Sequence, residues 1–299
     1  MPLSNQKKGY ILSFVAVLAM SNVFIFSKAA LNEINLFQFG VYWFGFAILW
    51  NLLYSIPGKK YRNIKKLKRK AYRALVIIGL LELIGTAFFF MAINKVENPA
   101  IVSFLTNLTP VFVASFGFLF LKERFNWLEA LGFALAISGA LIISYSKGKG
   151  IAEVFMDGTG YVIISCLAVS VAFIISKNFI KDIDPGVLAM NRVLFLFIFS
   201  IVLLMSNDMS IAISWKAIYN LLLGSLLGPF LAAITNYTSL KYIEASRATV
   251  IASTKSLFVL VGAFMYFGIF PRPLQVPGGI ITIFGVILVI AGKRILRKN

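Results

Sequence analysis

The chain has 299 residues, of which 60% are hydrophobic and only 13% are charged, with a formal net charge of +18. A soluble domain of this length could not bury so many apolar side chains, and nearly all of them fall in long uncharged runs. Because a backbone in lipid must satisfy its own hydrogen bonds, the runs indicate an all-α polytopic membrane protein. The positive charges crowd into short connections between the runs, which excludes a nucleic-acid partner and favours the lipid bilayer.

Missing residue types exclude several kinds of chemistry. The sequence contains no His and one Cys, Cys166. His-ligated metal sites, Ser-His nucleophiles and intrachain disulfides therefore do not arise. There is also no phosphate-binding Gly-Lys-Ser/Thr loop. We predict a protein that is not an enzyme, with no cofactor and no metal site.

Ten apolar runs are long enough to cross a membrane, since about 20 residues at roughly 1.5 Å rise span the hydrocarbon core. The first is taken as a span and not as a cleaved signal, because no small-residue cleavage site follows it. The expected transmembrane helices cover residues 10–30, 36–56, 74–94, 99–121, 126–146, 159–180, 186–206, 217–240, 246–270 and 275–292.

The second half of the sequence repeats the first at an offset of roughly 150 residues. Phe26-Ser27-Lys28 ends the first run as Ile175-Ser176-Lys177 ends the sixth. Five runs per half is an odd number, so the second half must enter the membrane from the opposite side. We therefore predict two inverted five-helix repeats, residues 1–150 and 151–299, related by an axis in the membrane plane.

The distribution of Lys and Arg predicts the orientation. With the N-terminus inside, most of these residues fall on the inner side, above all in the connection from Pro57 to Arg73. The outer side then holds only Lys28, Lys95, Lys147, Lys149, Lys216 and Arg272. Positive residues favour the cytoplasmic side, so we expect a multi-pass protein of the cell membrane with both termini cytoplasmic.

Small and aromatic residues indicate how the helices pack. Gly132 and Gly139 form a stripe that lets two helices approach closely in lipid. The segment from Gly224 to Pro229 predicts a bend in the eighth helix. Most of the four tryptophans are interpreted as anchors at the membrane interfaces; they are Trp43, Trp50, Trp127 and Trp215.

The pattern resembles the EamA type of the drug/metabolite transporter superfamily. The resemblance covers nearly the whole chain and rests on ten helices in two halves and on these motifs: Thr109-Pro110, Lys122-Glu123, Gly132 and Gly139. Halves in that family commonly end their fourth helix in Gly-Glu, whereas this chain has Lys122-Glu123 and then Gly268-Ile269-Phe270. An Arg early in the second helix of a half is also common, and Arg192 fits that place. The resemblance implies a secondary transporter that exports small organic solutes, such as amino acids, metabolites or drugs.

Three charged residues lie well inside expected spans, away from the span ends: Glu82, Arg192 and Lys255. Charges at a helix centre cost about 2.5–3.5 kcal/mol to insert, so they rarely face lipid. Their similar depths allow mutual pairing across a shared substrate cavity. The alternative is a buried structural ion pair, or an arginine that snorkels toward the membrane interface. Glu82 either meets Lys255 or Arg192, or holds a proton at neutral pH. We favour the protonated form, which would make Glu82 the candidate for proton coupling.

Uncharged polar residues at similar depth extend the candidate substrate site, namely Asn22, Asn107, Thr109, Ser253 and Ser256. Pro110 lacks a backbone donor and is expected to free the carbonyl of Thr106 for a ligand. Lys255 is expected to anchor an anionic group such as a carboxylate. The alternative for Asn and Thr residues is that they hold helices together.

Alternating access around a midplane site is the expected mechanism. A membrane-embedded enzyme or lipid-handling protein without transport activity is the alternative from another class, and a passive facilitator without coupling is a third. The expected partners are a small-molecule solute and the bilayer. The oligomeric state is left open between a monomer and a homodimer.

Overall fold

The structure is a computed structural model that describes residues 4–56, 67–96, 99–122, 125–144, 159–207, 210–268, 273 and 275–295. Within these ranges it consists of helices, with no strand. Seven helical segments are long and apolar enough to cross a membrane, and three further apolar helices are shorter. An all-helical, multi-pass membrane protein is therefore confirmed, whereas the count of ten spans stays a prediction.

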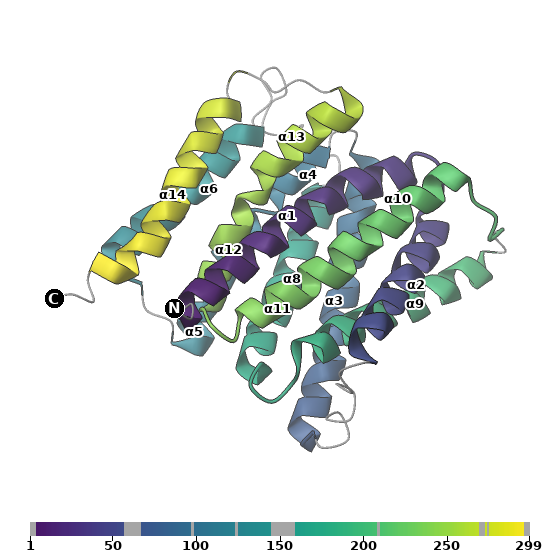
Figure 1. The fold of residues 1–299 in the computed structure, drawn as a ribbon, viewed down its shortest axis with the longest axis horizontal. Helices are drawn as coiled ribbons and strands as arrows, with labels where there is room; N and C mark the ends of the chain where they lie inside the picture. The colour runs from purple at the N-terminus through teal and green to yellow at the C-terminus, as the bar shows by residue number, and fades with distance from the viewer. Residues whose placement is uncertain are drawn as a thin grey trace.

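Figure 1 shows the helices packed against one another in one bundle. The first half contains α1 (Asn5–Leu31), α2 (Leu36–Ser55), α3 (Arg69–Lys95), α4 (Pro99–Leu105), α5 (Leu108–Leu121) and α6 (Trp127–Ser144). The second contains α8 (Thr159–Phe179), α9 (Pro185–Ser206), α10 (Trp215–Ser225), the π-helix η2 (Leu226–Ala232), α11 (Ala233–Ser239), α12 (Ala245–Ser253), α13 (Lys255–Phe267) and α14 (Gln275–Ile295). The predicted boundary at residue 150 lies outside the described residues.

Short polar residues start the helices at matching places in the two halves. Asn35 caps α2 in a capping box with Gln38, whose side chain reaches back to the Asn35 backbone. Asp184 caps α9 and accepts from the Gly186 backbone N–H, and Pro185 occupies the first helical turn. Each cap satisfies backbone donors that have no partner inside the helix.

Two expected spans are interrupted near their middle. The span 99–121 is divided into α4 and α5 at Thr106 and Asn107, and the span 246–270 into α12 and α13 at Thr254. The hydroxyls of Thr106 and Thr254 donate to the carbonyls three residues earlier, at 2.6 and 2.7 Å. Such bonds compete with helical backbone pairing. The second interruption was not predicted, since Leu257 and not a proline stands in the place of Pro110.

A proline also distorts the eighth expected span. Pro229 lies inside η2, between α10 and α11. Because proline lacks a backbone N–H and its ring crowds the preceding turn, it disrupts the regular helical ladder, and π-turns often accommodate such a defect. A π-helical turn therefore lies at the end of the segment from Gly224 to Pro229, and the bend predicted there stays a prediction.

Helices α6 and α14 lie side by side at one edge of the bundle (Figure 1). A Cβ on Gly132 would lie 2.8 Å from the carbonyl oxygen of Gly285, so only glycine permits this backbone approach. Trp43 corrects the interpretation of the tryptophans, because it is 1% exposed in the core and stacks on Phe39. Trp127 and Trp215 are exposed at helix ends, as expected of interface anchors.

Candidate functional site

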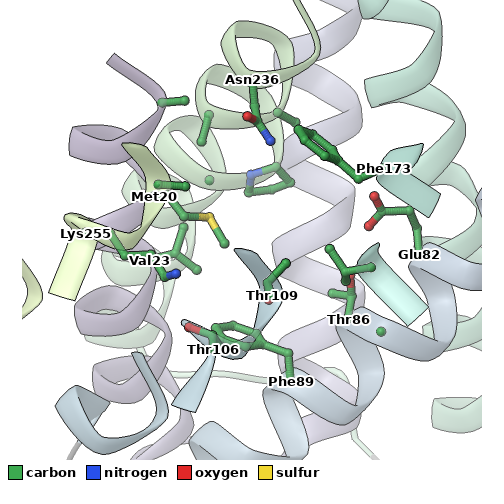
Figure 2. A pocket seen from close by; sticks show the side chains of 18 of the residues that line it. Met20, Val23, Glu82, Thr86, Phe89, Thr106, Thr109, Phe173, Asn236 and Lys255 are labelled. Atoms are coloured by element: carbon green, nitrogen blue, oxygen red, sulfur yellow. The ribbon is translucent and has the colours of Figure 1, made fainter. Parts of the chain in front are cut away.

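A cavity of about 180 Å³ lies between the helices. Its described lining comes from α1, α2, α3, the α4–α5 interruption, α8, α9, η2 with α11, and α12 with the first residue of α13. Figure 2 shows Lys255 and Glu82 on opposite sides of this space, with Met20 and Thr109 between them. The cavity therefore brings together side chains from both halves of the sequence.

Lys255 lines the cavity from the first residue of α13 and is 8% exposed. Its ammonium lies 3.5 Å from Oδ1 of Asn107, at the outer limit of a hydrogen bond. Among the described residues no carboxylate forms an ion pair with it. The mutual pairing of Lys255 with Glu82 that the sequence allowed is therefore absent from this arrangement.

The two interrupted helices contact each other beside Lys255. Asn107 donates from its side-chain amide to the hydroxyl of Ser256 at 2.9 Å. The hydroxyls of Ser256 and Ser103 lie 3.2 Å apart. The α4–α5 interruption is thus hydrogen-bonded to the start of α13, and this polar cluster holds Lys255 at the wall of the cavity.

Glu82 lies beside Arg192, which is one of the two alternatives that the sequence left open. Its Oε2 lies 3.1 Å from Nε of Arg192 in an ion pair, and its Oε1 accepts from the hydroxyl of Tyr237 at 2.8 Å. Arg192 also donates to the hydroxyl of Thr86 at 3.0 Å. The contacts with Arg192 and Tyr237 join α3 to α9 and α11, and the favoured protonated form of Glu82 stays a prediction.

The carbonyl of Thr106 is not free for a ligand, contrary to expectation. It accepts the backbone N–H of Thr109 at 3.0 Å, in a tight turn that bypasses Pro110. A three-residue turn of this kind satisfies the acceptor that proline leaves without a donor. The side chains of Thr106 and Thr109, together with Pro110, still line the cavity.

The other predicted site residues lie in different places. Thr109, Glu82, Arg192 and Lys255 line the cavity, whereas Asn107 and Ser256 lie behind Lys255. Asn22 is exposed and donates to the carbonyl of Leu18, away from the cavity lining. Ser253 is buried and donates to the carbonyl of Val250. These last two residues bond within their own helices, and the hydrogen bonds shown for them do not hold two helices together.

Several residues at polar contacts were missed. Tyr237 and Thr86 complete the Glu82 cluster, but neither carries a charge that would have distinguished it in sequence. Arg247, at the start of the expected span 246–270, is 3% exposed and pairs with Glu129 of α6 and with Glu244. The sequence did contain a signal for this pair. Glu129 and Arg247 have opposite charges, and each lies just inside an apolar run that is expected to start on the inner side of the membrane.

A multi-pass helical bundle with a buried, charged cavity is typical of membrane transport proteins, and the comparison with known families identifies that class. The sequence pattern of the EamA-like transporter family matches residues 7–145 and again residues 157–291. The chain therefore belongs to the EamA-like transporter family, as the resemblance predicted.

Individual relatives are also described as transporters. The uncharacterized transporter YdfC of Bacillus subtilis is 26% identical over 223 residues, which are 70% of this chain and 69% of that protein. A probable terminal-alkyne amino-acid exporter of Streptantibioticus cattleyicolor is 28% identical over 235 residues, 74% of this chain and 75% of that protein. A crystal structure at 14% identity aligns with a TM-score of 0.79, over 97% of this chain and 99% of the other, which shows the same fold.

Proposed function

We propose that this protein is a secondary transporter that exports small organic solutes across the cell membrane by alternating access. The cavity between Lys255 and Glu82 is its substrate site. Two inverted repeats, residues 1–150 and 151–299, would exchange conformations around this site. The two separate matches of the family pattern, each to one half of the chain, support the repeat arrangement.

The observation that carries this proposal is the meeting of two interrupted helices at the cavity. The α4–α5 interruption and the start of α13 join through Asn107 and Ser256, and Lys255 reaches the cavity from that junction. Transporters use interrupted helices at the midplane to offer polar groups to a substrate, because irregular backbone is tolerated only where it lines a cavity or is buried.

The direction of transport is inferred from a relative, and the orientation of the chain in the membrane is inferred from its charge. One relative carries the description of an amino-acid exporter. The distribution of Lys and Arg supports cytoplasmic termini. Reporter fusions at the N-terminus, at the C-terminus and in the connection 57–66 test this orientation, and a reporter found outside at any of them contradicts it.

Solute counterflow in vesicles tests the transport proposal. Vesicles containing the full chain and loaded with an unlabelled solute should accumulate the labelled form, within a panel of amino acids, organic anions and drugs. Ala252→Phe, which adds a ring to the cavity wall, should abolish accumulation. Leu119→Phe is the matched control, since Leu119 is 65% exposed on α5. Accumulation that survives Ala252→Phe would place the substrate path elsewhere.

A further inference from the structure

The charged groups of the cavity are unequal in number. The described lining contains two cationic side chains, Lys255 and Arg192, and one carboxylate, Glu82. Both oxygens of that carboxylate are engaged, one with Arg192 and the other with Tyr237. The Glu82–Arg192 pair is neutral as a unit, so the cavity retains the single positive charge of Lys255.

Lys255 is built to receive a ligand. Its ammonium has three donors, yet the contact to Asn107 at 3.5 Å is long, and the side chain is more than nine-tenths buried. An ammonium in the membrane interior with so little compensation is costly. An anionic ligand group would supply the missing counter-charge.

The rest of the cavity is mainly apolar. Met20, Val23, Phe89 and Phe173 lie around the space between the two charged clusters (Figure 2). Such side chains stabilise a hydrocarbon body through burial and dispersion. They offer no counter-charge to a ligand cation.

We propose that the substrate is a small organic monoanion, with one carboxylate or similar group on an apolar body, and that a zwitterionic amino acid binds less well. The carboxylate binds the ammonium of Lys255 and the body packs against Met20 and the phenylalanine rings. The ammonium of a zwitterion would find no unpaired carboxylate in the described lining, because both oxygens of Glu82 already have partners. This inference rests on the proposed function, because it assigns the substrate class of the same cavity.

Three probes with one hydrocarbon body separate the possibilities: 4-methylpentanoate, leucine and 4-methylpentanamide. At neutral pH these compounds are an anion, a zwitterion and a neutral amide, respectively. Titration of the purified full chain in detergent should show 4-methylpentanoate binding about tenfold or more tightly than the other two, which corresponds to one decade of Kd. Equal or tighter binding of leucine overturns the inference, as does the absence of binding by all three.

Variants locate the effect at one residue. Lys255→Met, of similar length, should lose about tenfold or more in affinity for 4-methylpentanoate and keep the weak affinity for the amide. Lys241→Met is the matched control, since Lys241 is exposed and outside the cavity lining. A Lys255→Met protein that melts normally and binds the anion as well as the native protein overturns the inference.

Transport is measured separately, so that the two proposals can fail independently. Protonated carboxylic acids cross bilayers unaided, so counterflow should use 3-methylbutane-1-sulfonate, which has the same body and stays ionised. Tight anion binding without counterflow would contradict the proposed transport function alone. Counterflow of leucine that exceeds that of the sulfonate would contradict the monoanion inference alone.

Discussion

The ammonium of Lys177 lies 2.6 Å from the carbonyl oxygen of Leu240, and equally close to that of Ile243, where the chain leaves α11. Lys28 makes the same kind of contact at the end of α3, with its ammonium 3.4 Å from the carbonyl of Ile93. Carbonyls at a helix end lack partners within the helix. The two lysines that the sequence comparison aligned therefore both bind helix ends, with shorter contacts for Lys177.

Replacing each lysine by methionine should show how much its contacts with the helix-end carbonyls contribute to stability. Lys177→Met removes a charged donor from two carbonyls and should lower the free energy of unfolding by about 1–3 kcal/mol. Lys28→Met should cost less, because its contacts are longer. Equilibrium unfolding in mixed detergent and SDS measures both. A larger loss for Lys28→Met would contradict the distances.

Glu82→Gln should destabilise the protein, because it leaves Arg192 without a counter-charge. Breaking a buried pair costs about 3–5 kcal/mol, and the partial exposure of Arg192, at 20%, should bring the loss toward the lower end. The double variant Glu82→Gln/Arg192→Met should recover part of the loss, which a double-mutant cycle measures. A stable Gln variant that loses proton-driven accumulation but keeps exchange would instead support a protonated Glu82.

The buried pair of Arg247 and Glu129 should join α12 to α6. Nε of Arg247 donates to Glu129 at 2.8 Å, and Glu129 also forms a capping box with Asn126 at the start of α6. Arg247→Met should therefore lower the free energy of unfolding by about 3–5 kcal/mol, since it leaves the buried carboxylate of Glu129 without its counter-charge. Adding Glu129→Gln should restore part of that stability in the same unfolding assay. Additive losses in the double variant would show that the two residues act independently.

Lys122→Gly should stabilise the protein. Lys122 ends α5 with φ of 54°, and Gly268 ends α13 with φ of 69°, both in the left-handed region. A side chain at such a φ costs about 1–2 kcal/mol, which glycine avoids, although its greater freedom in the unfolded state offsets part of the gain. We expect a net gain of a few tenths to about 1 kcal/mol. Gly268→Ala should shift the unfolding midpoint in the opposite direction.

Acid should weaken a contact between the α1–α2 connection and α10. A 2.8 Å ion pair with Lys216 and a hydrogen bond from Ser214 lower the pKa of Glu33 below its ordinary value of 4.5. A lowered folded-state pKa means that this stability is present above about pH 4.5 and is lost as the pH falls through the folded value. Melting curves between neutral and acidic pH should show a smaller acid-side loss for Glu33→Gln. An unchanged acid profile would contradict this role.

The sequence by itself determined the protein's class and most of its helices. Long uncharged runs in lipid must be helical because unpaired backbone groups have no water to bind. Motifs around Pro110, Gly132 and Gly139 led to the family because they are local patterns. Pro229 likewise predicted an irregular helix, because a missing backbone N–H disturbs only the adjacent helical turn, which the local sequence shows.

Only the tertiary structure decided which polar side chains meet. The rotation of each helix about its axis is set by packing against several neighbours, so depth alone could not distinguish Asn22, which faces outward, from Thr109, which lines the cavity. The same limit applies to charge. Glu82 contacts Arg192 and Tyr237, whereas Lys255 contacts Asn107. Such contacts require side chains to lie within a few ångströms of one another, and the sequence does not show which distant helices come that close.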